Sequence, residues 1–404
     1  MKVAVIGGGA AGFFAAVHAS GSGNEVAIFE KSPKVLSKVK VSGGGRCNVT
    51  HRPIEISKLV KNYPRGEKFL KKAFRHFSIE DTFHWFESRG VFLKIEEDGR
   101  VFPVSDDSQT IIKTLTEEAQ KRGVKILVST GIQDLKPIAN GFEIVTSSGS
   151  LRFDKVIIAT GGHPNKDSYG FLKSLRHKII NPIPSLFTFN TPGEKIRELM
   201  GISMPKAEVK IEGTKLTYQG PILITHWGIS GPAVLKLSAF GAQWLFDQQY
   251  HARAIINWNA EMGEQDYAEQ ILNYCKSHPS RKILTNPLFG VPARLWEHFC
   301  EKCGITESQL YGNVPKKIQN RLVQNLFCFI LEIKGKTTFK EEFVTAGGIP
   351  LEEVDPDTMQ SKYHPNLFFA GEVLNLDGIT GGFNFQAAWT TGYIAGCSAK
   401  SNVL

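Results

Sequence analysis

The chain has 404 residues, more than a single hydrophobic core usually spans, so we expect two or three domains. With 42% hydrophobic and 22% charged residues it has the composition of a folded globular protein, which excludes a fibrous or disordered chain. The net charge of +9 favours anionic ligands but identifies none, because the basic residues are scattered. Their densest stretch, Lys58 to Arg75, is typical of the polar face of a helix.

Cysteine usage and hydropathy exclude two further classes. Six cysteines are too few for a disulfide framework, and reduced thiols are typical of a cytoplasmic protein. Cys300 and Cys303 form a C-x-x-C pair, but no second pair accompanies them at zinc-finger spacing, so we expect packing rather than a metal site. No run of about 18 apolar residues occurs, and three glycines interrupt the apolar N-terminus. We therefore expect neither a membrane span nor a signal peptide.

The first elements in chain order form a nucleotide-binding pattern. Residues 2–6 (KVAVI) are typical of a buried parallel strand. Three glycines follow at the spacing G-x-G-x-x-G: Gly7, Gly9 and Gly12. A helical segment at 13–19 and a second strand at 25–30 come next, and that strand ends in Glu30.

Each part of this pattern has a physical role. The first glycine makes a tight turn, the second lets the main chain approach a pyrophosphate, and the third allows close packing of helix on strand. The helix N-terminus faces the phosphates, and Glu30 can accept a hydrogen bond from a ribose hydroxyl. The sequence therefore predicts an adenine dinucleotide, either FAD or NAD. Glu30 disfavours NADP, because a 2′-phosphate would face its carboxylate.

A second glycine-rich segment at 42–50, with the sequence SGGGRCNVT, raises a structural question. Three consecutive glycines lose much backbone entropy on folding, so they need a reason. One reason is a left-handed main chain that lies close to a ligand, with Arg46 and Asn48 as donors. The other is an ordinary surface turn. The segment taken alone leaves both open.

The next part of the chain departs from the regular repeats of an NAD dehydrogenase. The expected elements are a helical region at 58–89, a helix at 110–122, strands at 124–129, 141–145 and 151–153, and a strand at 154–159 that runs into ATGG. The two central strands flank the turn SSGS and read as antiparallel. A meander that closes into a strand ending in ATGG resembles the FAD domain shared by glutathione-reductase-like flavoproteins.

The C-terminal segment agrees with FAD rather than NAD. Residues 366–372 read as a strand that ends in a Gly-acid step, which in such flavoproteins lies beside the ribityl–pyrophosphate part of FAD. The segment DGITGG then leads into a helix at about 384–397, whose N-terminus carries about half a positive charge. Aimed at a flavin edge, this helix end would stabilise negative charge on the ring. Four glycine segments in this order predict FAD.

Several motifs together resemble one bacterial family. They are VIGGGAAG, SGGGRCNVT, ATGG, ITHWGISGP, TAGGI and AGEVLNLDGITGGFNFQ, and they are spread over essentially the whole chain. The chain is similar to the bacterial NAD(P)/FAD-dependent oxidoreductases whose named branches include aminoacetone oxidases and 3-dehydro-bile-acid Δ4,6-reductases. The resemblance implies that residues 43–48 wrap around FAD, with Arg46 and Asn48 as contacts. We expect Cys47 to be a buried packing residue rather than a redox thiol. His51 stands where an Asn is common.

The resemblance also implies the architecture. The expected fold class is α/β: a discontinuous Rossmann-like FAD-binding domain of the glutathione-reductase-like class, with an inserted small β-barrel and a helical subdomain. The expected boundaries are 1–183 with 336–404 for the FAD-binding domain, 184–262 for the barrel and 263–335 for the helical subdomain. Short alternating strands (LFTFN, AEVKIEG, KLTYQG, PILITH, RAIINW) favour the barrel. Helical periodicity at 266–276, 293–303 and 316–331 favours the subdomain.

The site residues that these patterns predict all bind the cofactor. They are Gly7, Gly9, Ala10, Ala11, Gly12, Glu30, Lys31, Gly44, Gly45, Arg46, Cys47, Asn48, Thr160, Gly161, Gly371, Glu372, Asp377, Gly382, Phe383 and Asn384. The sequence identifies no catalytic acid or base, because the flavin performs the hard chemical step. GISGP at 228–232 lacks the last glycine of a nucleophile elbow, so Ser230 is not expected to attack a substrate. His226 and Trp227 either face a substrate cleft or, as we expect, pack together.

The predicted function is that of an FAD-dependent oxidoreductase that transfers a hydride between flavin and a small organic substrate, with NAD(P)H as electron donor. No second G-x-G-x-x-G follows a strand after residue 160, so NAD(P)H would dock transiently. One alternative is a dioxygen-using amine oxidase of the aminoacetone type. Another is a flavin-carrying RNA-associated protein, which the charge permits. No RNA-binding signature occurs, so we expect no nucleic-acid partner.

Overall fold

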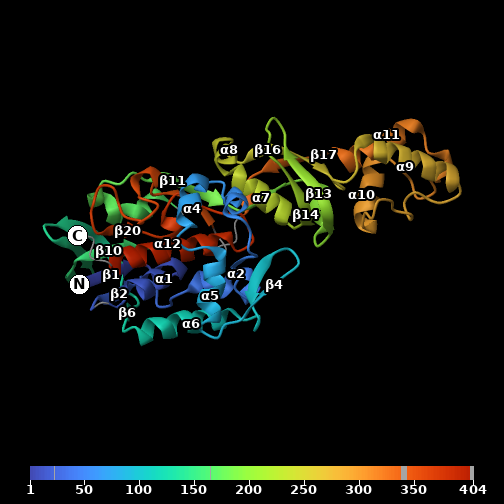
Figure 1. Cartoon of the computed structure of the whole chain (residues 1–404). Helices are drawn as coiled ribbons and strands as arrows, with labels where there is room; N and C mark the ends of the chain where they lie inside the picture. Colours follow the sequence, from blue (N-terminus) through green and yellow to red (C-terminus); the bar gives the residue numbers. More distant parts are fainter. Residues whose placement is uncertain (22, 164, 338–343, 401–404) are drawn as a thin grey trace. The chain divides into compact units, whose positions relative to one another are not determined.

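The computed structural model describes residues 1–21, 23–163, 165–337 and 344–400. The chain forms two compact units, one made of Met1–Ser185 with Phe339–Leu404 and the other of Leu186–Thr338 (Figure 1). The first unit thus comes from two separated stretches of the chain, and the second is an insertion between them.

A five-stranded parallel sheet forms the centre of the first unit, with the strand order β20-β10-β1-β2-β6. Its strands are β1 at Lys2–Ile6, β2 at Glu25–Phe29, β6 at Lys125–Leu127, β10 at Lys155–Ile158 and β20 at Leu367–Phe369. β1 is the middle strand, and Val3, Ala4 and Val5 on it are fully buried, as is typical of a parallel sheet covered on both faces. The predicted Rossmann-like fold of this unit is confirmed.

Two helices lie side by side on this sheet (Figure 1): α1 at Ala10–Ala19 and α12 at Phe383–Lys400. They approach closely because Gly392 and Gly396 on α12 lack side chains. A Cβ on these glycines would lie 2.7 Å from Ala11 O and 2.4 Å from Ala15 O, respectively. The pairing of 11 with 392 and of 15 with 396 shows that the helices run parallel. At a rise of 1.5 Å per residue, the N-terminal end of α12 therefore extends about 12 Å beyond the N-terminus of α1.

Smaller sheets and further helices complete the first unit. The antiparallel meander predicted before ATGG is confirmed as β7 at Ile132–Ile138, β8 at Gly141–Thr146 and β9 at Gly149–Phe153. The other strands are β3 at Thr50–His51, β4 at Leu93–Ile95, β5 at Arg100–Pro103, β11 at Ile180–Ser185 and β19 at Val344–Gly348. The α-helices are α2 at Ser37–Gly45, α3 at Ile56–Leu59, α4 at Glu67–Ala73, α5 at Ile79–Glu87 and α6 at Ser108–Lys121. Short 3-10 helices are η1 at Val60–Asn62, η2 at Lys166–Leu175, η5 at Leu351–Glu353 and η6 at Gly371–Val373.

A seven-stranded antiparallel sheet forms the centre of the second unit, with the order β17-β16-β13-β14-β15-β12-β18. Its strands are β12 at Thr188–Asn190, β13 at Ser203–Ile211, β14 at Thr217–Ile224, β15 at Gly228–Ser230, β16 at His251–Asn257, β17 at Phe329–Lys334 and β18 at Lys336–Thr337. The outermost strands, β17 and β18, are separated only by Gly335. One stretch of chain thus pairs with β16 at its start and with β12 at its end. Closure into the predicted barrel stays a prediction.

The helices of the second unit are η3 at Lys195–Leu199, α7 at Pro232–Phe240, α8 at Ala242–Asp247, α9 at Glu264–Ser277, α10 at Ala293–Cys303, η4 at Tyr311–Asn313 and α11 at Lys316–Phe327. The prediction that the last helix continues to Leu331 is wrong, because α11 ends at Phe327 and β17 follows. Buried and less buried residues alternate along β17, which pairs with β16, so the period of a strand replaces that of a helix. The sheet and α9 to α11 share one apolar core.

Candidate functional site

The first glycine motif lies where β1 ends and α1 begins. Gly7 has a positive φ of 115°, and a Cβ on it would lie 2.3 Å from Ala159 O. A Cβ on Gly12 would lie 1.9 Å from Gly7 O, so both positions require glycine. Gly9 differs, because no atom lies within 4 Å of where its Cβ would be. Space thus remains beside the helix end at Ala10, whose free N–H groups carry partial positive charge and suit an anion.

Backbone amides fix the carboxylate of Glu30 at the end of β2. Oε2 accepts a hydrogen bond from Gly8 N at 2.8 Å, and Oε1 accepts one from Ser32 N at 2.8 Å. Each oxygen has lone pairs for a further donor, so the carboxylate can also accept from a ribose hydroxyl beside the glycine motif. Lys31, the next residue, is exposed.

Most of the segment Gly43–Cys47 has a left-handed main chain, which both readings of its sequence allow. Regular helical geometry in α2 stops before the first glycine. Four residues then have positive φ: Gly43 (59°), Gly44 (69°), Gly45 (86°) and Cys47 (63°). Gly43 is tightly packed, since a Cβ there would lie 2.9 Å from the Phe102 ring, but no atom lies within 4 Å at Gly44 or Gly45. The segment thus presents bare main chain beside open space.

The two donors of this segment bind the protein itself. The Arg46 guanidinium donates to Glu96 Oε1 at 2.6 Å and lies 3.9 Å from the centre of the Phe102 ring. Asn48 Oδ1 accepts a hydrogen bond from Val101 N at 3.3 Å. These contacts anchor the segment to β5 and to the turn after β4. Contact of Arg46 and Asn48 with the cofactor stays a prediction.

Three buried polar atoms near the end of β10 have no hydrogen-bond partner in the described part of the structure: Thr160 Oγ1, His163 Nε2 and Thr345 Oγ1. Gly162 lies against one of them, since a Cβ there would be 2.6 Å from Thr345 Oγ1. Gly161 has a φ of 72° and no atom within 4 Å of its Cβ position. Buried polar atoms are nearly always paired, so an unpaired group indicates a place for a ligand or a water molecule. The residues here fit a bound group with polar atoms.

The Gly-acid step after β20 connects the sheet to α1 and α2. Gly371 has a φ of 75° and lies against α1, since its Cβ would be 2.8 Å from that of Ala11. Glu372 Oε1 accepts from Thr345 N at 2.7 Å, and Oε2 accepts from Lys38 Nζ at 2.8 Å. Because Lys38 belongs to α2, Glu372 links the helix before the second glycine segment to the edge of the sheet.

The N-terminus of α12 is held by the loop that precedes it. Gly382 has a φ of 88°, and a Cβ on it would lie 2.2 Å from a main-chain oxygen of β3. The Phe383 ring stacks on His51, with ring centres 4.8 Å apart and an angle of 18° between planes. Asn384 Oδ1 accepts from Gly378 N and its Nδ2 donates to Gly378 O, both at 2.8 Å. Asn384 therefore holds the loop against the helix start.

Asp377 is fully buried and forms an ion pair that sequence reasoning missed. Both of its carboxylate oxygens accept hydrogen bonds from the Arg65 guanidinium, and Ser185 Oγ donates to it at 2.7 Å. Burial raises the pKa of Asp377, although Arg65 and Ser185 counteract the rise. The two charged residues are 312 positions apart, so no local pattern connects them. Asp377 thus anchors the loop before α12.

Buried thiols have packing roles in both units. Cys47 and Cys300 are fully buried, and burial raises the pKa of each thiol to about 12. The thiolate is the form that attacks or binds metals, so neither is reactive at neutral pH. Among the residues that the structure describes, no group of three or more His, Cys, Asp or Glu side chains is placed to hold a metal ion. No helix within those residues is long and apolar enough to cross a bilayer.

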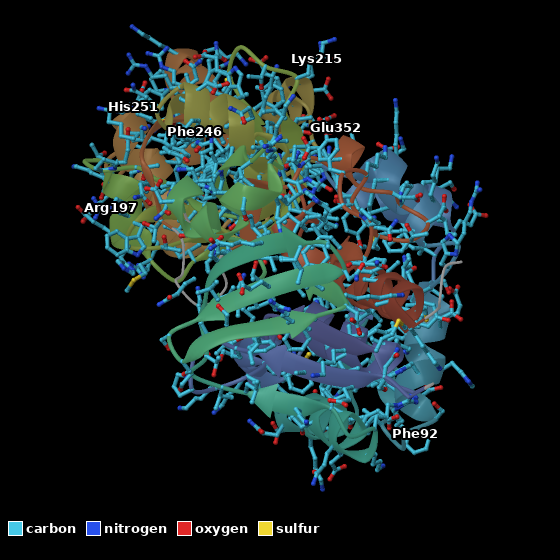
Figure 2. All side chains as sticks on the ribbon, turned by 90° about the vertical axis from the view of Figure 1, so that its left-hand side faces the viewer. Phe92, Arg197, Lys215, Phe246, His251 and Glu352 are labelled. Carbon is cyan, nitrogen blue, oxygen red and sulfur yellow. The ribbon has the colours of Figure 1, made fainter. Side chains whose placement is uncertain are left out.

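The second unit contains three residues to which the sequence analysis assigned no catalytic role: Ser230, His226 and Trp227. Ser230 is buried, and its hydroxyl lies 3.0 Å from Thr188 Oγ1 in a hydrogen bond. His226 and Trp227 form the turn between β14 and β15, with ring centres 4.6 Å apart. Trp227 is 43% exposed, so the two rings pack on each other but are not buried. Arg197, labelled in Figure 2, donates to His226 O at 2.7 Å.

Two helix ends of the first unit suit groups that carry negative charge. The α1 N-terminus suits a pyrophosphate. The α12 N-terminus extends about 12 Å beyond it and suits a second group that carries negative charge. The fold is that of the FAD-binding Rossmann flavoproteins. Residues 1–398 match the model described as the HI0933-like protein Rossmann domain, and the chain belongs to that family. The predicted family resemblance and the predicted cofactor, FAD, are confirmed.

The chain is an FAD-dependent oxidoreductase. Two relatives match nearly its whole length. A 3-dehydro-bile acid delta(4,6)-reductase of Clostridium scindens is 28% identical and covers 98% of this chain and 98% of its own length. A ribosomal RNA dihydrouridine synthase of Haemophilus influenzae is 28% identical, with coverages of 98% and 97%. The solved structure of a 3-ketosteroid-delta4-(5alpha)-dehydrogenase from Rhodococcus jostii RHA1 shares the fold. Its TM-score is 0.53 at 15% identity, and the match covers 99% of this chain and 97% of that one.

Proposed function

We propose that the protein is an FAD-dependent reductase that saturates a carbon–carbon double bond conjugated with a carbonyl group. The observation that carries this proposal is that two relatives, matched end to end, have names that describe the same kind of bond change. The 4,6 double bonds of a 3-dehydro bile acid are conjugated with its 3-oxo group. The uridine double bond that is lost in dihydrouridine is conjugated with a ring carbonyl. Such a bond accepts a hydride at its far carbon because the carbonyl oxygen takes up the negative charge.

The residues of the first unit bind and orient the cofactor in this proposal. FAD, when bound, supplies the hydride chemistry. The helix end at Ala10 and the open main chain at Gly9 accommodate the pyrophosphate, and Glu30 accepts from the ribose. The bare main chain at Gly44 and Gly45 allows close approach of the ring system. The α12 N-terminus favours negative charge beside it.

NAD(P)H is the proposed electron donor, and it would dock without a domain of its own. The chain has no second G-x-G-x-x-G after a strand beyond residue 160. A nicotinamide held only transiently is released after hydride transfer and leaves room for the substrate. The substrate in this proposal is a small molecule with a conjugated ketone.

An anaerobic absorbance titration of the FAD-loaded protein tests this function. We expect NADH or NADPH to bleach the oxidised flavin band and 2-cyclohexen-1-one to restore it. Cyclohexanone has the same carbonyl without the double bond and is the matched control, which should leave the band bleached. A flavin that neither nicotinamide reduces, but that an amine reduces with release of peroxide in air, would contradict the proposal and favour the amine oxidase.

Uridine in RNA is a second candidate substrate, which a basic surface favours. Four basic side chains of α4 and its C-terminal turn have the spacing i, i+3, i+4, i+7 and are exposed: Lys68, Lys71, Lys72 and Arg75. Phe69 and Leu70 on the same helix are buried, as predicted for this stretch. Residues at this spacing share one helix face, so the four charges suit successive phosphates of a nucleic acid.

RNA binding separates the two candidate substrates. If RNA is the substrate, uridine-containing RNA reoxidises the reduced flavin, and Lys68→Glu with Lys72→Glu weakens salt-dependent RNA binding while reduction by NAD(P)H is unchanged. If cyclohexenone reoxidises the flavin and RNA does not, the RNA candidate is wrong and the small-molecule reductase stands.

A further inference from the structure

Gln386 on α12 is fully buried, and its amide group is completely hydrogen-bonded. Its Oε1 accepts from Thr50 Oγ1 at 2.6 Å and from Thr82 Oγ1 at 2.9 Å. Its Nε2 donates to Ser78 O at 3.0 Å and to Thr390 Oγ1 at 3.1 Å. A side-chain amide offers two acceptor and two donor positions, so this group is saturated. Saturated buried networks make the segments that they join rigid.

The two hydroxyls that donate to Gln386 belong to different segments. Thr50 begins β3 and follows directly after the glycine segment that ends at Asn48. Thr82 lies in α5, and its hydroxyl reaches the same oxygen from the other side of the network. Both threonines are fully buried. They therefore form a pair for comparison. Each has its hydroxyl within hydrogen-bond distance of Gln386 Oε1, although that of Thr82 also lies 3.2 Å from Ser78 O, and only Thr50 is joined to the glycine segment.

The main chain beside Thr50 also contacts the start of α12. A Cβ on Gly382 would lie 2.2 Å from Thr50 O, so these two backbones are in direct contact. Trp389 Nε1 donates to Val49 O at 2.9 Å, which adds a second hydrogen bond from α12 to this segment. Residues 49–50 thus contact Gly382, which directly precedes α12, and are hydrogen-bonded to Gln386 and Trp389 on α12.

We propose that Gln386 is a positioning residue that, through Thr50, fixes the glycine segment 43–48 against the N-terminus of α12 and so sets both the affinity for FAD and the reduction potential of the bound flavin. The inference rests on the FAD site of the proposed function. A ligand that contacts two segments binds more tightly when the protein already holds them in their correct relative position, because binding then does not have to order them. The influence of a helix end on a ring falls off within one turn, so a small shift of α12 changes the potential.

Isosteric substitutions of the two threonines test the proposal. Thr50→Val and Thr82→Val each remove one hydroxyl without a change of shape, and we expect both to lower the urea midpoint of the FAD-free protein by similar amounts. Thr50→Val should raise the FAD dissociation constant about tenfold, the size expected for one buried hydrogen bond, and shift the flavin potential. Thr82→Val should change the dissociation constant less than about twofold. Thr50→Ser keeps the hydroxyl and should restore wild-type affinity and potential.

Equal effects of the two valine substitutions on FAD affinity and potential would overturn the proposal, because the influence of Gln386 would then not pass through Thr50 and the glycine segment. If Thr50→Val does not fold, Trp389→Phe removes the hydrogen bond to Val49 O and keeps an aromatic ring. That variant must also weaken FAD binding, and unchanged affinity and potential would overturn the proposal. Failure of the unmodified protein to bind FAD, or of its flavin to reduce an enone, contradicts the proposed function instead.

Discussion

The two units contain similar sequence signals, but these signals have different structural roles. In the first unit, backbone atoms lie close to where a Cβ on Gly12 would be, whereas the corresponding position at Gly9 is open space. We call glycines of the first kind closed and those of the second kind open. In the second unit, the glycine that begins GISGP is closed, since a Cβ on Gly228 would lie 2.2 Å from Phe189 O. Cys300 there is packed in the core.

This difference explains when a glycine-rich motif indicates a ligand. Gly9, an open glycine of the first unit, follows a strand of the parallel sheet and precedes a helix N-terminus, where partial positive charge gathers. Of the glycines of GISGP, Gly228 belongs to an antiparallel sheet and Gly231 follows it before α7, and both lie close to neighbouring backbone atoms. Spacing alone therefore does not identify a binding loop; the element before it and the space beside it do.

The largest expected effect is that of Gly12→Ala. The added methyl group would lie 1.9 Å from Gly7 O, so α1 must move away from the turn after β1. We expect a loss of about 3 kcal/mol in the free energy of unfolding and loss of FAD from the remaining folded protein. Urea unfolding and FAD titration measure the two effects.

Gly228→Ala is the matched control in the second unit, because its methyl group would meet Phe189 O at 2.2 Å. It should also lower stability, but the folded fraction should bind FAD with unchanged affinity. If Gly228→Ala weakened FAD binding as much as Gly12→Ala, the contrast between the two units would be wrong.

The second-largest expected effect is a loss of folding stability at acidic pH. Burial lowers the pKa of His18 on α1 from 6.5 to about 4, so between these values the unfolded chain binds a proton that the folded chain does not. The contribution of His18 to stability therefore rises with pH in this window and falls by roughly 1 to 2 kcal/mol as the pH drops from 7 to 5. His18→Phe keeps an aromatic ring and should reduce this slope in urea unfolding at both pH values.

The parts of the fold that local sequence determines were predictable. The run from β1 through the glycine motif to β2 and Glu30 is contiguous, and its strand, turn and helix signals all agree. α10 has the predicted bounds, because its apolar residues recur on one face. The glycine segment 43–45 left two readings open, and its left-handed main chain is compatible with both, because a glycine turn also takes positive φ.

The parts that depend on distant residues were not predictable. Arg65 reaches Asp377 across 312 positions, and Thr50 reaches Gln386 across 336. β17 was predicted as the end of a helix because its pairing with β16 is not visible in its own sequence. Gln386 stood in the quoted motif GGFNFQ. A glutamine among apolar residues, between Phe385 and Ala387, was the available signal for a buried network.

Gly9→Ala separates an effect on the free energy of unfolding from an effect on the space proposed for FAD. Gly9 has a φ of −91°, which alanine adopts readily, and no atom lies within 4 Å of its Cβ position. We expect unfolding of the FAD-free protein to change by less than about 0.5 kcal/mol, since no contact is disturbed. The methyl group occupies the space proposed for the pyrophosphate, so FAD should bind about tenfold more weakly, equal to about 1.4 kcal/mol. Unchanged FAD affinity would show that the cofactor does not approach this loop.

The smallest effect concerns exposed aromatic rings, which both units carry. Phe92, labelled in Figure 2, is 67% exposed beside the β4–β5 hairpin, and its main-chain oxygen accepts from Val104 N at 2.9 Å. Phe92→Thr keeps that backbone bond, so unfolding should change by less than about 0.5 kcal/mol and FAD affinity should not change. The same hairpin holds Glu96, the partner of Arg46. Weaker FAD binding by Phe92→Thr at unchanged stability would therefore mean that the hairpin sets the position of the glycine segment, and that the FAD site extends beyond the edge of the parallel sheet.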